Sequence, residues 1–198
     1  MRAVRMTAAL ILAVVLASVS ATFLGLVDAG REIDASLSRL EREASELHRA
    51  TTDSIEHGAS ADAINRPRTS LRRMIDAFGP NAERVVRDTA TPFTVPIAPW
   101  FGEQISLTPS VENISKAFGD YLEQAKQTQA DARGTKSAAA LGSRLLELSY
   151  GVIVQRIGDA RDRTRQASAR ALNGLQLITF LSIGLAALAV GLTPDQYS

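Results

Sequence analysis

The chain of 198 residues contains no cysteine, only 5% aromatic residues and a net charge of just +1. The absence of cysteine excludes disulfides, thiol catalysis, zinc ribbons and iron–sulfur clusters. The near-zero net charge argues against a general nucleic-acid-binding protein, which needs a basic excess to neutralise phosphates.

Residues that carry catalysis are equally scarce. The two histidines, His48 and His57, are nine residues apart, so a helix would place them on opposite faces. We interpret both as surface residues rather than a metal pair. No glycine-rich phosphate loop, nucleophile elbow or zinc-protease motif is present. We therefore expect no enzyme, no metal site and no cofactor.

Long uncharged runs are instead concentrated at the two ends of the chain. Residues 6–27 and 171–194 carry no charged side chain, and each run can cross the roughly 30 Å hydrocarbon layer as a helix. We predict membrane helices at 6–27 and 171–193. The first run has an alternative interpretation as a cleaved signal peptide, with Arg2 and Arg5 as its basic start and Val19-Ser20-Ala21 as a cleavage site.

The flanking charges predict how the chain crosses the membrane. The basic segment 1–5 favours a cytoplasmic N-terminus. Five arginines before the second run would favour the cytoplasm for that flank: Arg156, Arg161, Arg163, Arg165 and Arg170. This preference of basic flanks for the cytoplasm, the positive-inside rule, weakens for connections longer than about 60 residues. We therefore expect a two-pass protein of the bacterial inner membrane, with residues 28–170 in the periplasm and 194–198 as a short cytoplasmic tail.

The connecting segment has helical periodicity. Apolar or small residues recur at steps of three and four in three stretches, which predicts a buried seam on each of three helices. The seams are Ile33, Leu37, Leu40, Ala44, Leu47 and Thr51; Val111, Ile114, Phe118, Tyr121 and Ala125; and Leu141, Leu145, Leu148 and Val152.

Another helix is predicted to start at Ser60 or Asn65 and to stop at Gly79-Pro80, with a separate short turn capped by Asn81 after it. Its predicted buried face holds Leu71, Met74, Ile75 and Phe78. The proline-rich stretch 89–109 is predicted to be irregular, with Trp100 as a hydrophobic plug or, alternatively, in a ligand-facing loop. Between Val27 and Gly58 only Gly30 departs from a good helix sequence, so one helix is expected to run out of the membrane.

These patterns predict an all-α fold. We expect a membrane-anchored antiparallel four-helix bundle whose first and last helices are continuous with the two transmembrane helices.

Two clusters are candidate binding sites. Small residues at four-residue spacing in the first span would let transmembrane helices approach closely: Ala13, Ala17, Ala21 and Gly25. This ladder aligns with the seam at Ile33, Leu37 and Leu40, which predicts a homodimer through the first span and first helix.

The second cluster is basic. Arg68 and Arg72 are one helical turn apart, and Arg73 follows them. Across a dimer axis, such guanidinium groups could hold a small planar anion. The alternative is a solvated face that pairs with neighbouring carboxylates.

The layout of a basic N-terminus, a span, about 140 helical residues and a second span resembles the sensor region of bacterial chemotaxis transducers and sensor histidine kinases. Within that group, Ala63-Ile64-Asn65 followed by Ser70-Leu71-Arg72-Arg73-Met74 resembles the segment of nitrate-sensor and pilus-transducer domains that carries a ligand-contacting arginine. The resemblance implies that Arg72, or Arg73 in the other register, contacts a ligand.

The resemblance implies a membrane-bound sensor that relays the binding of a small anion or a periplasmic protein across the membrane. The expected partners are membrane lipid and a second copy of the chain. Since no output module follows the second span in this sequence, the chain is either a fragment of a longer receptor or has a separate cytoplasmic output protein as a further partner. The alternative is a membrane-anchored helical scaffold or an accessory subunit of another membrane protein.

Overall fold

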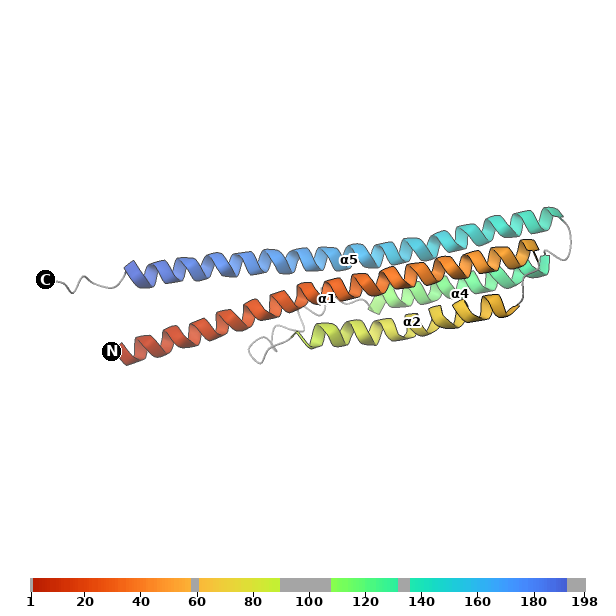
Figure 1. Ribbon diagram of the computed structural model, residues 1–198. Coiled ribbons are helices and arrows are strands. Elements are labelled where there is room, and N and C mark those ends of the chain that lie inside the picture. Colours follow the sequence, from red (N-terminus) through yellow and green to blue (C-terminus); the bar gives the residue numbers. More distant parts are fainter. Residues whose placement is uncertain (1, 58–60, 90–107, 132–135, 192–198) are drawn as a thin grey trace. The chain divides into compact units, whose positions relative to one another are not determined.

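The computed structural model describes residues 2–57, 61–89, 108–131 and 136–191, with side chains described for 7, 10–57, 64–89, 109–130 and 140–185. It contains four helices, which are α1 (Arg2–His57), α2 (Ala61–Arg87), α4 (Thr108–Asp131) and α5 (Lys136–Gly191), and no strand within these residues (Figure 1). The prediction of an all-α chain is confirmed. The stretch around Trp100 lies outside the described residues.

The chain divides into two compact units, which we call unit 1 and unit 2. Unit 1 covers residues 1–31, 85–105 and 165–198, and unit 2 covers 32–84 and 106–164. Both α1 and α5 are uninterrupted helices that supply residues to each unit.

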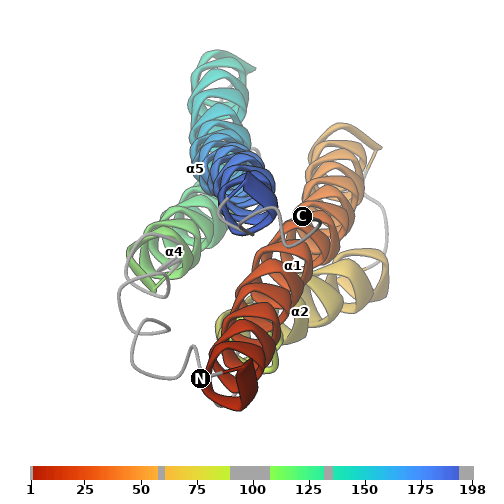
Figure 2. The same ribbon diagram turned by 90° about the vertical axis from the view of Figure 1, so that its left-hand side faces the viewer.

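Unit 2 contains parts of all four helices, whose end-on arrangement can be followed in Figure 2. The pairs Asp34–Arg161 and His48–Glu147 join α1 to α5, so the two helices run in opposite directions. The Thr128 hydroxyl near the end of α4 donates to the carbonyl of Gly142 near the start of α5, and Arg163 further along α5 donates to the Ser110 hydroxyl at the start of α4. The helices α4 and α5 are therefore antiparallel as well.

The core of unit 2 follows the sequence pattern on α1 and α4. All six predicted seam residues of α1 are buried, from Ile33 to Thr51. On α4 the seam residues from Ile114 to Ala125 are buried and Val111 is half-buried. These two seams were correctly predicted because each helix has a single apolar face.

The predicted end of the second helix at Gly79-Pro80 is wrong, since α2 continues to Arg87 through both Pro67 and Pro80. A proline inside a helix removes one backbone hydrogen bond and costs about 3 kcal/mol. The helix continues because its buried face extends beyond the proline: Leu71, Ile75 and Phe78 are followed by buried Ala82. It begins at Ala61, directly after Ser60.

The predicted seam of α5 is also wrong. Leu141, Leu145, Leu148 and Val152 are exposed, by 61%, 41%, 68% and 42%. The buried face of the helix is formed instead by Gly142, Leu146, Ile153, Ile157 and Ala160. The helix thus has two apolar faces, and only packing against α1 and α4 selects the inner one.

Unit 1 has a small core between α1 and α5. Phe23, Leu26 and Ala171 are buried, and partly buried apolar side chains pack around them: Val19, Val27, Val86, Leu175 and Ile178. Gly174 allows the two helices to approach, because a Cβ there would lie 2.6 Å from Cε1 of Phe23. Most other large apolar side chains described in unit 1 are exposed, among them Leu10, Leu24, Leu177 and Phe180.

Gly142 provides a stability test of the α4–α5 contact. A Cβ at this position would lie 2.8 Å from Cγ2 of Thr128, a buried β-branched side chain that cannot rotate away easily. We expect Gly142→Ala to lower the free energy of unfolding by about 1–3 kcal/mol through overpacking. Chemical denaturation followed by circular dichroism measures the change.

Gly119 on α4 is the matched control, since nothing lies within 4 Å of a Cβ built there. Gly119→Ala is expected to stabilise the protein by about 1 kcal/mol, the helix-propensity difference. Equal effects of the two substitutions would contradict the close approach of α4 and α5.

Candidate functional site

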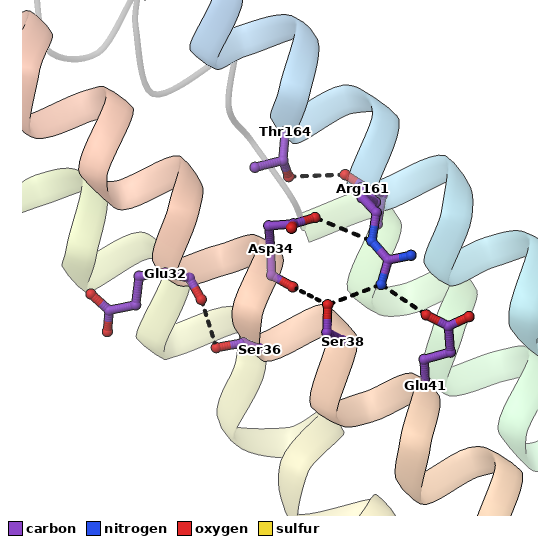
Figure 3. A network of polar contacts seen from close by, with 8 residues as sticks. Glu32, Asp34, Ser36, Ser38, Glu41, Arg161 and Thr164 are labelled. Carbon is purple, nitrogen blue, oxygen red and sulfur yellow. Dashed lines mark hydrogen bonds and ion pairs between the residues drawn. The ribbon is translucent and has the colours of Figure 1, made fainter.

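Arg161 on α5 joins two carboxylates of α1 inside unit 2 (Figure 3). Its Nη2 lies 2.8 Å from Oε2 of Glu41, and its Nε lies 3.1 Å from Oδ1 of Asp34. The same Nη2 donates to the Ser38 hydroxyl at 3.2 Å. We call these four residues the Arg161 cluster. Asp34, Ser38 and Glu41 share one face of α1 because they follow steps of four and three.

The electrostatics of the Arg161 cluster favour a permanent charge. The hydrogen bond to Glu41 raises the pKa of Arg161 above its ordinary value, burial opposes the rise, and the charges of Glu41 and Asp34 add to it. Both atoms of the 3.1 Å contact with Asp34 are buried. An arginine that keeps its proton cannot act as an acid or base, so Arg161 can hold α1 and α5 in register but does not itself transfer a proton.

A second polar cluster surrounds His48. Its Nε2 lies 2.8 Å from Oε2 of Glu147 on α5, and its Nδ1 lies 3.2 Å from the Tyr121 hydroxyl on α4. The imidazole is stacked on Tyr150 with ring centroids 4.3 Å apart and planes 4° from parallel. We call these residues the His48 cluster. It connects three of the four helices.

The interpretation of His48 as a surface residue is therefore wrong, because only 16% of its side chain is exposed. The periodicity carried a usable signal: His48 follows the buried Leu47 and lies one turn before the buried Thr51. His57, at the end of α1, is exposed as predicted.

Tyr121 is the most deeply buried titratable group of the His48 cluster. Burial raises its pKa to about 12, a hydrogen bond with Thr51 opposes the rise, and the nearby Tyr150 and Glu147 add to it. The phenol therefore stays neutral at physiological pH. The direction of the hydrogen bond between His48 Nδ1 and the Tyr121 hydroxyl depends on the tautomer of His48.

The predicted arginine site lies apart from these clusters on α2. Arg72 and Arg73 are exposed and Arg68 is half-buried. None of the three forms an ion pair among the side chains that the structure describes. Arg68 and Arg72 are thus free to meet an anion, within the described part of unit 2.

The small-residue ladder is only partly accessible. Ala13, Ala17 and Ala21 are exposed, whereas Gly25 is half-buried against Thr89. A Cβ built on Gly25 would lie 3.0 Å from the Cβ of Thr89. The seam that was expected to continue the ladder is buried within the chain, since Ile33, Leu37 and Leu40 are at most 2% exposed. That part of α1 therefore cannot also form a contact with a second copy.

The remaining chemistry of the described side chains is limited. No group of three histidine, cysteine, aspartate or glutamate side chains among them is arranged to hold a metal ion. Comparisons with protein-family models, with curated proteins and with solved structures give no match.

The buried phenol of Tyr121 predicts an alkaline loss of stability. Its folded pKa of about 12 lies above the unfolded value of 10.0, so the contribution is complete below pH 10 and is lost as pH rises toward 12. Two pKa units correspond to about 2.7 kcal/mol. Denaturant unfolding measured between pH 9 and 12 is expected to show this decline.

Tyr121→Phe is the control, because it removes the titrating hydroxyl but keeps the ring. The variant should lose about 1 kcal/mol at pH 8, where the hydrogen bond to His48 is missing. Its stability should then fall less steeply above pH 10. An unchanged slope would assign the alkaline loss to other groups.

Proposed function

We propose that the chain is a membrane-bound sensor that converts binding outside the cytoplasm into a displacement of two transmembrane helices. In this proposal unit 2 is an extracytoplasmic antiparallel four-helix bundle. Residues 6–27 and 171–193 cross the membrane, and both termini are cytoplasmic.

Membrane insertion is supported by the apolar surface of unit 1. Of the helices in the described part of the chain, α1 alone has a stretch long and apolar enough to cross a membrane, and it lies near the N-terminus, where a signal sequence would pass the same test. The side chains of α5 are described only as far as Leu185, and from Ala171 to that point six large apolar ones are exposed by more than 40%: Leu172, Leu177, Phe180, Leu181, Ile183 and Leu185. Apolar exposure on this scale is unfavourable in water and favourable in lipid.

The observation that carries the relay is the connection between α1 and α5. These are the two helices that hold the apolar runs, and each is one uninterrupted helix. Arg161 joins them through Asp34 and Glu41, and His48 joins them through Glu147. An ion pair in a partly buried site has a small number of allowed registers, so a shift of α5 against α1 would move between discrete states.

A ligand can shift such an equilibrium only through its different affinity for the two states, typically 1–3 kcal/mol. The exposed guanidinium group of Arg72, with Arg68 one turn before it and Arg73 beside it, supports a small planar anion such as a carboxylate as that ligand. Arg68, Arg72 and Arg73 are therefore the proposed ligand-binding residues.

The topology can be tested with single cysteines, because the chain has none of its own. Glu123 on α4 and Arg72 on α2 are exposed. Glu123→Cys and Arg72→Cys should react with a membrane-impermeant maleimide on intact spheroplasts. A cysteine introduced at Ser198 should react only after lysis. Labelling of Glu123→Cys only after lysis would contradict a periplasmic unit 2.

The anion site can be tested on the full chain in detergent. Replacing chloride with nitrate or acetate at equal ionic strength should raise the melting temperature, by about 2–4 °C for each kcal/mol of binding free energy. Arg72→Ala should abolish the rise, because it removes the exposed guanidinium group of the pair. Arg84→Ala, an exposed arginine elsewhere on α2, should retain it. If neither anion changes the melting temperature of the unmodified chain, the arginines are surface charges.

A further inference from the structure

The exposed large apolar side chains of unit 2 are concentrated on one helix. Among the described residues of that unit, the four that are exposed all lie on α5: Leu141, Leu145, Leu148 and Val152. We call this set the α5 stripe. Single exposed apolar residues are common on protein surfaces, but an ordered row of four is typical of an interaction surface.

The spacing of the α5 stripe is that of a coiled-coil seam. Its steps of four, three and four residues place the side chains at alternating a and d positions of a heptad. A seam of this kind is self-complementary, because in a parallel pair each residue meets its own equivalent across a two-fold axis. Beside the stripe, Gly151 has nothing within 4 Å of a built Cβ, so a neighbouring helix can approach closely there.

Lipid does not fit as the occupant of the α5 stripe. The stripe ends at Val152, and Arg156 and Asp159 follow on exposed positions of the same helix before the apolar run begins at Ala171. Burying this stretch in hydrocarbon would place several charges in the membrane core at a cost of about 2.5–3.5 kcal/mol each.

The remaining surface of unit 2 leaves a second copy of the chain as the best match. The apolar seams of α1 and α4 are buried, as is the apolar face of α2. Within the described residues, the apolar surface that a second unit 2 can offer is therefore the same stripe. The charges beside the stripe are compatible with this pairing. In a parallel pair Arg144, at a g position, lies next to Ser149, at an e position of the second copy, so no like charges meet there.

The area of the α5 stripe limits the strength of the contact between two copies. Four side chains cover a few hundred Å² per partner, below the roughly 800 Å² per partner of a standard stable interface. The stripe is thus too small to hold a dimer at dilute concentration. Two copies anchored in one membrane have the same orientation and a much higher effective concentration, on the order of 1 mM for flexibly linked partners.

We propose that the α5 stripe is the contact through which two membrane-anchored copies of this chain form a parallel dimer. The proposal rests on the proposed function only for the shared membrane that aligns the copies. It places the dimer contact on α5 rather than on the first helix or on the arginine face of α2. The paired part of α5 ends at Val152. If the heptad continued, Asp159 would lie opposite Asp159 of the second copy, and the two negative charges would repel each other.

Disulfide cross-linking of the full chain in native membranes tests this contact. Leu141→Cys and Leu148→Cys each place one thiol at a d position, where in a parallel pair the two copies come close enough for a disulfide. Both variants should form a covalent dimer on oxidation with copper phenanthroline, seen on non-reducing gels. Glu123→Cys on α4 and Arg72→Cys on α2, both exposed, are matched controls that should remain monomeric.

A second substitution separates specific pairing from collision. Adding Leu145→Glu to Leu148→Cys should lower the cross-linked fraction by about fivefold or more, since it introduces two like charges at the centre of the seam. Adding Leu145→Met, which keeps the apolar volume, should leave the cross-linked fraction within about twofold. Because these positions are exposed, the substitutions leave the core of unit 2 intact.

Each contrary result overturns a defined part of the proposal. Dimers of Arg72→Cys without dimers of Leu148→Cys would move the contact to α2. Leu148→Cys dimers that are insensitive to Leu145→Glu would reflect collision. Failure of Leu141→Cys alone to cross-link would indicate an antiparallel pair, in which that residue faces Val152. Maleimide labelling of Leu148→Cys on spheroplasts reports the topology separately, so failure of the proposed function can be distinguished from failure of the dimer.

Discussion

The register between α1 and α5 in unit 2 is the constraint on which the other features of that unit depend. Arg161 selects it, because its guanidinium group satisfies Asp34 and Glu41 at once, and these carboxylates are two helical turns apart on α1. An apolar seam of leucine and isoleucine tolerates a slip of one heptad with little loss, whereas a charged pair does not. The cluster therefore contributes register more than it contributes stability.

The His48 cluster adds a second condition on the same pair of helices and extends it to α4. His48 can satisfy Glu147 and Tyr121 together only when α1, α4 and α5 are in their observed positions. Thr128 of α4 in turn bonds to the backbone of Gly142, at the start of α5. Polar contacts thus connect α1, α4 and α5, and α2 lies against α4 where Gly79 approaches Val111.

The two faces of α5 have separate roles. Its inner face, from Leu146 to Ile157, completes the core of unit 2. Its outer stripe is covered by nothing in the described part of the chain. In the proposed dimer, α5 would contribute to the core of unit 2 and present its outer stripe to a second copy. The small size of the stripe suits such a role, because a weak contact can be made and broken while unit 2 stays folded.

The sequence by itself determined the all-helical class, the uninterrupted α1 and α5, and the buried seams of α1 and α4, because each of these depends on local pattern alone. Tertiary structure decided the rest. It selected the buried face of α5, where Leu146, Ile153 and Ile157 compete with an equally regular outer stripe, and periodicity cannot rank two apolar faces. It carried α2 through Pro80, because burial of Phe78 and Ala82 outweighs a local penalty. It also brought Arg161 to Asp34 and Glu41 and His48 to Tyr121, since the partner of a residue more than 70 positions away in sequence cannot be read from a local pattern.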